Sequence, residues 1–212
     1  IGAGSITIEA NGDGTAKVTQ NENVTDKDDD VAVTGSNAGT SNAVDIINNT
    51  DDDLKVTLSD VTITDTKGDA AVSVSGTGDT TIELNGSNTL ESSGWHAGLE
   101  RNEEKDSAGN VVSGKLTIQD EEKNGSLDAT GGYGGAGIGG ANLNNSGAIE
   151  ITGGTITATG GTAPYSFGIC ANGGITVNGG HVIAETKATS ETHIALNAAP
   201  ALPNTTYWWR TA

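Results

Sequence analysis

Short runs of alternating apolar and polar residues fill most of the chain and predict β-strands. In the run Lys55–Leu58, Val56 and Leu58 are apolar and the intervening Thr57 is polar. Because successive side chains of a strand point to opposite faces, Val56 and Leu58 are expected to face a core and Thr57 the solvent. No stretch with apolar residues at helical spacing is long enough to predict a helix of any size. The pattern therefore predicts an all-β protein.

The strands recur in a fixed order, which predicts a repeat architecture. Each copy has three strands, and the central ones are Lys55–Leu58, Thr81–Leu84, Lys115–Ile118, Ala148–Ile151 and Gly174–Val177. In the first strands, corresponding apolar positions follow at steps of 28, 27, 39, 31 and 25 residues: Val44, Val72, Leu99, Ile138, Ile169 and Ile194. Such a unit cannot bury its own apolar face and must stack on its neighbours. We expect a parallel β-helix with three strands per rung and roughly six to seven rungs, right-handed by the crossover rule for parallel strands.

The regularity of the pattern divides the chain into three parts. Residues 1–42 are irregular and are expected to form N-terminal rungs and a cap. Residues 43–198 are expected to form the regular rungs, with a loop insertion at 100–112. Residues 199–212 break the pattern and are expected to be a C-terminal plug or a link to a following module.

Charge and cysteine content exclude several classes of function. The formal net charge is −18 and only ten residues are Lys or Arg, so neither nucleic-acid binding nor attachment to an anionic membrane is expected. A single cysteine allows no internal disulfide, and no run of residues is apolar and long enough for membrane insertion. The absence of an initiating Met suggests a segment of a longer chain with flanking modules. The acidic, cysteine-poor composition is typical of a secreted or cell-surface bacterial protein.

Two glycine-rich segments carry a resemblance to a known group of proteins. Gly134–Gly140, followed by Gly147–Gly160, resembles the repeats of large bacterial cell-surface proteins, particularly of the Gram-positive type. Leu202–Arg210 is similar to the tails that follow such repeats, so the resemblance covers roughly residues 43–212. Those regions are described as right-handed β-helix or carbohydrate-binding-like parts of adhesins, and the chain also distantly resembles pectate-lyase-like β-helices. The resemblance implies a β-helix on the surface of a bacterial cell, and for a binding module in that location we expect a glycan or a host or matrix surface as the ligand.

Three aromatic residues occupy equivalent corners of successive copies. Trp95, Tyr133 and Tyr165 each lie four or five residues before the first strand of their copy, and stacked copies lie about 4.8 Å apart. The neighbouring strands are expected to add a nearly side-chain-free floor made by Gly98, Gly137, Gly139 and Gly168. The polar partners expected to hydrogen-bond a sugar chain beside these rings are His96, Glu100 and Arg101. In the alternative interpretation the rings pack on each other or under the 100–112 loop and only stiffen the corner.

Clusters of aspartates raise the question of a structural calcium ion, the one cofactor considered. Calcium takes six to eight oxygen ligands from carboxylates and carbonyls. The candidate ligands are Asp28, Asp30, Asp51 and Asp53. No EF-hand or nonapeptide calcium repeat is present, and such runs are also typical of a solvated surface that keeps sheet edges apart.

Catalysis is not expected. A lyase acting on acidic sugars would need a basic residue beside bound calcium, and away from the tail the only arginine is Arg101, in the loop insertion. Glu83 and Glu150 are expected two rungs apart, close to the upper limit for a pair of hydrolytic carboxylates. We therefore expect a non-enzymatic, adhesin-type binding module that recognises a glycan along an aromatic edge. The alternatives are a rigid spacer within a surface protein and, with less support, a polysaccharide lyase.

Overall fold

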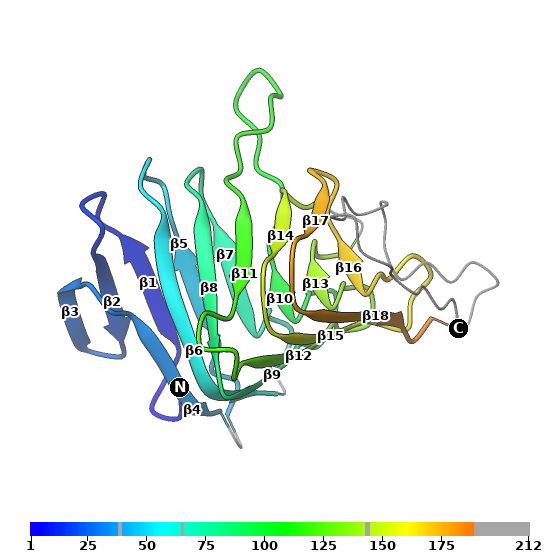
Figure 1. Cartoon of the computed structure of the whole chain (residues 1–212), viewed down its shortest axis with the longest axis horizontal. Coiled ribbons are helices and arrows are strands. Elements are labelled where there is room, and N and C mark those ends of the chain that lie inside the picture. The colour runs from blue at the N-terminus through cyan, green and yellow to red at the C-terminus, as the bar shows by residue number, and fades with distance from the viewer. Residues whose placement is uncertain (38–39, 65, 143–144, 189–212) are drawn as a thin grey trace.

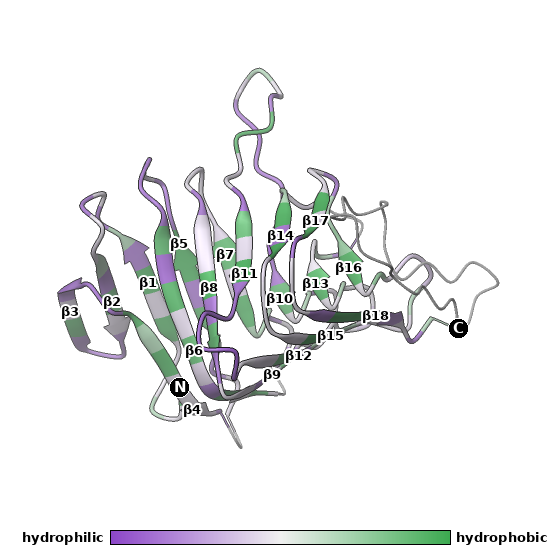
Figure 2. Cartoon of the chain, viewed as in Figure 1, coloured by the Kyte–Doolittle hydropathy of each residue, from purple (hydrophilic) through white to green (hydrophobic). Residues whose placement is uncertain are grey.

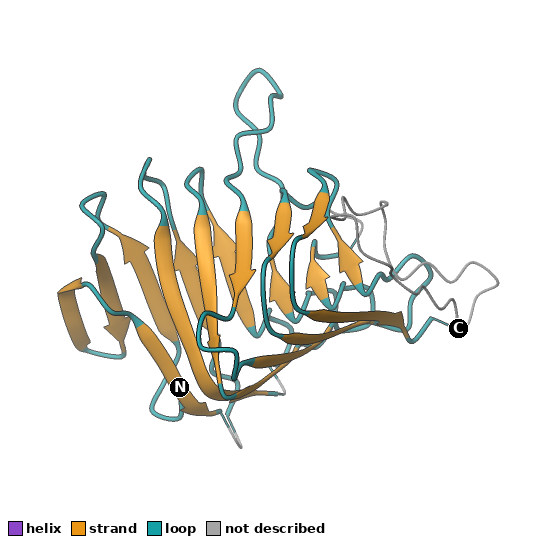
Figure 3. Cartoon of the chain, viewed as in Figure 1, coloured by secondary structure: helices purple, strands orange, loops and turns teal. Residues whose placement is uncertain are grey.

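The computed structural model describes residues 1–37, 40–64, 66–142 and 145–188. Within these ranges the chain forms strands, turns and loops and no helix (Figure 3), which confirms the prediction of an all-β protein. No apolar helix of membrane-spanning length occurs in this described part of the chain. The strands belong to two sheets, A and B (Figure 1).

Sheet A is mixed and has eight strands. Its last three strands in spatial order pair antiparallel, and the other neighbours pair parallel. The spatial order is β16 (Ile169–Cys170), β13 (Ile138–Gly139), β10 (Leu99–Glu100), β7 (Val72–Ser75), β5 (Val44–Ile47), β1 (Ile6–Ala10), β2 (Ala16–Gln20) and β3 (Asn23–Asp28).

Sheet B is parallel, has ten strands and curls into a half-barrel. Nine strands form one path and β4 (Ala32–Ser36) pairs with β6 beside it. The path is β17 (Ile175–Val177), β14 (Ile149–Ile151), β11 (Leu116–Gln119), β8 (Thr80–Asn85), β6 (Leu54–Ile63), β9 (Ser87–Glu91), β12 (Ser126–Thr130), β15 (Thr155–Gly160) and β18 (His181–Thr186).

The prediction of a parallel β-helix with three strands per rung is wrong. The predicted second and third strands do not form two separate layers, because β6 runs through both positions as one ten-residue strand. Its first part pairs with β8 and its last residues pair with β9, so hydrogen bonding continues where a corner was expected. The pairing of β6 with β4 is irregular between Ser59 and Val61, where Asp60 has a left-handed backbone (φ 52°). In sheet A, the strands β1, β2 and β3 at one edge pair antiparallel, which also differs from the stacked parallel strands of a β-helix.

The alternating pattern builds one continuous core between the two sheets. On sheet A, Val44, Val72, Leu99, Ile138 and Ile169 pair in register and are fully buried, as the alignment of the copies predicted. Sheet B contributes a second buried column, which consists of Val56, Ile82, Ile118, Ile151 and Val177. Hydrophobic and hydrophilic positions alternate along the strands of both sheets (Figure 2). Burial of these branched side chains supplies the main driving force for folding.

The connections between strands also follow the sequence in part. Gly86, Gly154 and Gly180 lie between consecutive strands of sheet B and have left-handed backbones (φ 64°, 87° and 80°). The segment 101–115 between β10 and β11 projects beyond the ends of the strands, at the top of Figure 1. The expected sixth copy at Ile194 and the tail at 199–212 lie outside the described residues.

Candidate functional site

Three stacked corners carry the aromatic residues singled out in the sequence. They precede β10, β13 and β16, and we call them together the corner ladder; they comprise residues 93–97, 132–136 and 163–167. The Gly134 amide donates to the Gly94 carbonyl (3.3 Å), and the Ala163 amide donates to the Tyr133 carbonyl (2.7 Å). Backbone hydrogen bonds thus continue from corner to corner, and the three corners lie side by side.

The three rings remain exposed. The exposed fractions of Trp95, Tyr133 and Tyr165 are 50%, 53% and 59%. The rings of Trp95 and Tyr133 meet edge to face, with centroids 4.8 Å apart and an angle of 89° between planes. A Cβ on Gly134 would lie 2.3 Å from Cε3 of Trp95, so the indole packs directly on that glycine. Trp95 and Tyr133 therefore form a solvent-exposed apolar surface in which the two ring planes are perpendicular.

Tyr165 has a strained backbone. Its φ of +66° lies in the left-handed region, which large L-residues rarely adopt. Strain of this kind costs roughly 1–3 kcal/mol and is concentrated at functional sites. Since the ring is more than half exposed, its burial does not compensate for this strain.

The expected glycine floor is not present. A Cβ on Gly98 would meet the Leu90 carbonyl oxygen and the Thr130 amide, both at 2.8 Å. Gly168 stands in the same way against β15 and β18, and Gly137 against β12 and β15. These glycines therefore face the backbone of sheet B, where no side chain fits, and they hold the corners close to the core instead of forming an outer surface.

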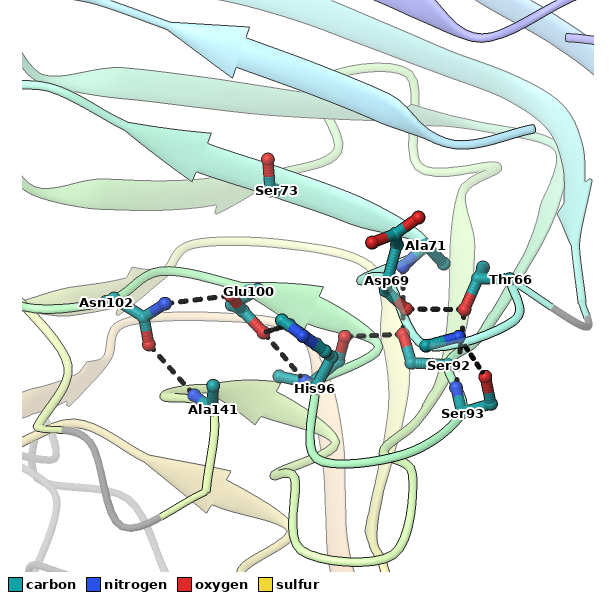
Figure 4. Close-up of polar contacts among 12 residues, drawn as sticks. Thr66, Asp69, Ala71, Ser73, Ser92, Ser93, His96, Glu100, Asn102 and Ala141 are labelled. Carbon is teal, nitrogen blue, oxygen red and sulfur yellow. Dashed lines mark hydrogen bonds and ion pairs between the residues drawn. The ribbon is translucent and has the colours of Figure 1, made fainter. Parts of the chain in front are cut away.

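His96, the residue after Trp95, forms a hydrogen-bonded pair with Glu100 (Figure 4). His96 Nδ1 lies 2.9 Å from Glu100 Oε2. The same oxygen accepts from the Ala97 amide (3.0 Å), and Oε1 accepts from Asn102 Nδ2 (2.7 Å). The carboxylate of Glu100 is buried whereas the imidazole is partly exposed, at 8% and 37% of their side-chain surfaces. The imidazole of His96 can therefore contact a ligand, while the buried carboxylate of Glu100 holds the imidazole in place through Nδ1.

Serine side chains missed by the sequence analysis fix the first corner. Ser92 Oγ donates to the Ala97 carbonyl (2.6 Å) and accepts from the Ala71 amide (2.8 Å). Ser93 Oγ accepts from the Gly68 amide (2.7 Å), so the turn 66–69 supports the corner that carries the indole (Figure 4). Small hydroxyl residues are so frequent in this chain that nothing in the sequence distinguishes these two.

Arg101 is not a surface partner of the ladder. Its side chain is fully buried, and its guanidinium donates to backbone carbonyls of Val74 (3.3 Å), Gly76 (2.7 Å) and Gly114 (2.7 Å). Burial lowers the pKa of the guanidinium from its ordinary value. Arg101 therefore has a structural role at the base of the projecting segment, and the prediction that it contacts a ligand is not supported by its position.

The candidate calcium ligands do not gather into a site. Among the described residues, no group of three or more His, Cys, Asp or Glu is placed to hold a metal ion. The Asp28 carboxylate accepts from the Asp30 amide (3.2 Å). Asp53 accepts from the Thr81 hydroxyl (3.0 Å), so its carboxylate links two neighbouring strands. Asp51 is exposed.

The only cysteine is buried near the corners. Cys170 packs with Ala97 and Ala136 in a small second apolar cluster, against the partly buried Phe167. Burial raises the pKa of its thiol, which favours the protonated, unreactive form. The cysteine thus contributes packing beneath the corner ladder.

Comparison of the chain with protein-family models, with curated proteins and with solved structures gave no match.

Proposed function

We propose that the corner ladder binds a glycan and that the chain is a non-enzymatic, adhesin-type binding module. Sugar rings stack on Trp95, Tyr133 and Tyr165, and the imidazole edge of His96 hydrogen-bonds a hydroxyl group. The observation that carries the proposal is the exposure of three large rings on three adjacent, hydrogen-bonded corners. The chain contains only seven aromatic residues in all, so three together in solvent are a concentration of apolar surface that calls for a partner.

The strained backbone of Tyr165 supports the same proposal. A structural aromatic would bury its ring, and a structural turn favours glycine, asparagine or aspartate at a left-handed position. Tyr165 does neither. A ligand that stacks on the ring explains why a tyrosine stands there.

A location on the outside of a bacterial cell belongs to the proposal and rests on composition and on the resemblance of residues 134–160 to surface repeats. The acidic, cysteine-poor chain suits that environment. Labelling of intact cells with an antibody against the domain tests it. Signal only after cell lysis contradicts an external location.

Binding to the ladder is tested with a glycan array followed by calorimetry on the hits. Trp95→Ala is expected to weaken binding at least about tenfold, or about 1.4 kcal/mol, because it removes the largest stacking surface. Val24→Ala is the matched control, since Val24 is similarly exposed (51%) but lies on β3, at the far edge of sheet A. Unchanged affinity in Trp95→Ala, with an intact far-ultraviolet circular dichroism spectrum, would refute the proposed site.

A further inference from the structure

The corner ladder has almost no charge. Its three corners, residues 93–97, 132–136 and 163–167, contain no Asp, Glu, Lys or Arg, and His96 is their only residue with a basic side chain. The supporting turn 66–69 contains one lysine, Lys67, and one aspartate, Asp69, so its formal charge is zero. An acidic sugar would therefore find no lysine or arginine in the corners to pair with.

The other basic residues are mostly committed elsewhere. Five lysines form ion pairs with Glu or Asp in the described part of the chain, namely Lys17, Lys27, Lys55, Lys105 and Lys115. The formal net charge of the chain is −18. An acidic glycan that approaches the protein is therefore repelled by negative charge. Such long-range repulsion is strong at low ionic strength and is screened by salt.

The hydrogen bonds of Glu100 orient the imidazole of His96 and determine which of its nitrogens faces solvent. The buried carboxylate accepts from the Ala97 amide, from Asn102 Nδ2 and from His96 Nδ1. An ionised carboxylate only accepts hydrogen bonds, so in the neutral imidazole the proton is assigned to Nδ1. Nε2 then presents a lone pair, which accepts from a sugar hydroxyl but repels the oxygens of a carboxylate or sulfate.

We propose that the corner ladder selects uncharged glycans, that His96 is its specificity-determining residue and that Glu100 is the positioning residue that holds the imidazole as an acceptor. This inference rests on the proposed function. It adds the class of ligand and assigns different roles to the two polar residues. Asn102 supports the pair, since its Oδ1 accepts from the Ala141 amide (2.9 Å) while its Nδ2 donates to Glu100 (Figure 4).

The test compares neutral polysaccharides with acidic derivatives of the same backbones. Hydroxyethyl cellulose, dextran, xylan and galactomannan are immobilised beside their carboxymethylated or sulfated forms. The wild-type protein and Trp95→Ala are measured at about 20 mM and about 500 mM salt. We expect Trp95-dependent binding to a neutral backbone, at least about tenfold weaker binding to its acidic form at low salt, and a smaller difference at high salt.

Two variants separate the role of the pair from simple loss of structure. His96→Lys places a cation at the ladder and is expected to reverse the preference toward the acidic derivative. Glu100→Ala frees the imidazole to present a protonated Nε2, so the ratio of neutral to acidic binding is expected to fall severalfold. Damage to the fold would lower both affinities and leave their ratio unchanged.

The tautomer is also measured directly from the imidazole ¹⁵N chemical shifts of His96. We expect the shift of an unprotonated Nε2 in the wild type and its loss in Glu100→Ala. An unprotonated Nδ1 in the wild type would overturn the inference, and so would Trp95-dependent binding that is equally strong to acidic derivatives. In both cases the proposed glycan site would stand. No Trp95-dependent binding to any glycan would refute the proposed function and, with it, this inference.

Discussion

Replacement of Arg101 by methionine removes four hydrogen bonds from the interior of the protein. The guanidinium donates from Nε and Nη2 to the Gly114 carbonyl, from Nη2 to Gly76 and from Nη1 to Val74. The Gly76 carbonyl keeps a bond from the Gly114 amide (3.3 Å). The main loss therefore falls on the buried carbonyls of Val74 and Gly114. Both lose a charge-assisted donor in the interior of the protein.

The size of the effect follows from these contacts. Leaving a buried polar group without its donor costs about 1–3 kcal/mol, so two carbonyls give about 2–6 kcal/mol. Methionine fills a similar volume and spares the protein the burial of a charge, which offsets part of this cost. We expect Arg101→Met to lower the free energy of unfolding by about 3 kcal/mol. With a urea m-value of about 2–3 kcal/mol/M for a domain of this size, the midpoint falls by about 1 M.

Urea unfolding followed by circular dichroism measures this loss, and Lys105→Met in the same projecting segment is the control. Lys105 is about half exposed and pairs with Glu103 (2.8 Å), so its replacement is expected to cost less than about 0.5 kcal/mol. Folded Arg101→Met protein is expected to bind glycan like the wild type. A loss below 1 kcal/mol, or one equal to that of Lys105→Met, would refute the structural role assigned to Arg101.

Three further predictions concern the ladder and the outer face of sheet B. Gly134→Ala places a Cβ against the Trp95 indole and is expected to weaken glycan binding severalfold with little change in the melting temperature; unaltered affinity would contradict the packing. Tyr165→Gly is expected to be about 1 kcal/mol more stable than Tyr165→Ala, because only glycine relieves the left-handed backbone; equal urea midpoints would argue against that conformation. The hydrogen bond from Lys115 lowers the pKa of Glu150 below 4.5, so the stability that this pair adds is complete above that pH and is lost as the pH falls below it. Glu150→Gln is therefore expected to reduce the stability difference between pH 7 and about pH 3.5, and an unchanged difference would exclude the pair as a source of acid sensitivity.

The columns of sheet A were predictable from the sequence. Apolar residues such as Val72 and Leu99 recur in the same context, and a one-residue error would bring polar residues into the core. The position of the corners was predictable for the same reason, because Trp95 lies four residues before Leu99 and Tyr133 five residues before Ile138. The similar spacing brings the corners side by side once the strands that follow them pair in register.

The register of sheet B was less accessible. The sequence places Leu116 opposite Ile82, whereas the structure pairs Ile82 with Ile118. A shift of two residues leaves the same faces inside and outside, so alternation of apolar and polar residues does not detect it. Only the contacts between neighbouring strands decide between the two registers.

The curl of sheet B and the burial of Arg101 were not accessible either. In β6 every second residue is buried up to Leu58, but the next buried residue is Val61, three positions later. A corner and a bulge both produce such a break in the alternation. The structure has a bulge there, with the left-handed Asp60. Arginine is rarely buried, and the need for a donor at the carbonyls of Val74 and Gly114 arises only once the chain is folded.

The projecting segment shows how this architecture tolerates change in length. Leu99 and Ile138 pair directly although 39 residues separate them, whereas Val72 and Leu99 pair across 27. Gain or loss of residues within the projecting segment therefore leaves the paired strands on either side in register, provided that Arg101 still closes the base. Evolution can diversify this protrusion without altering the corner ladder, and a protein engineer can use the same place to display a peptide of choice.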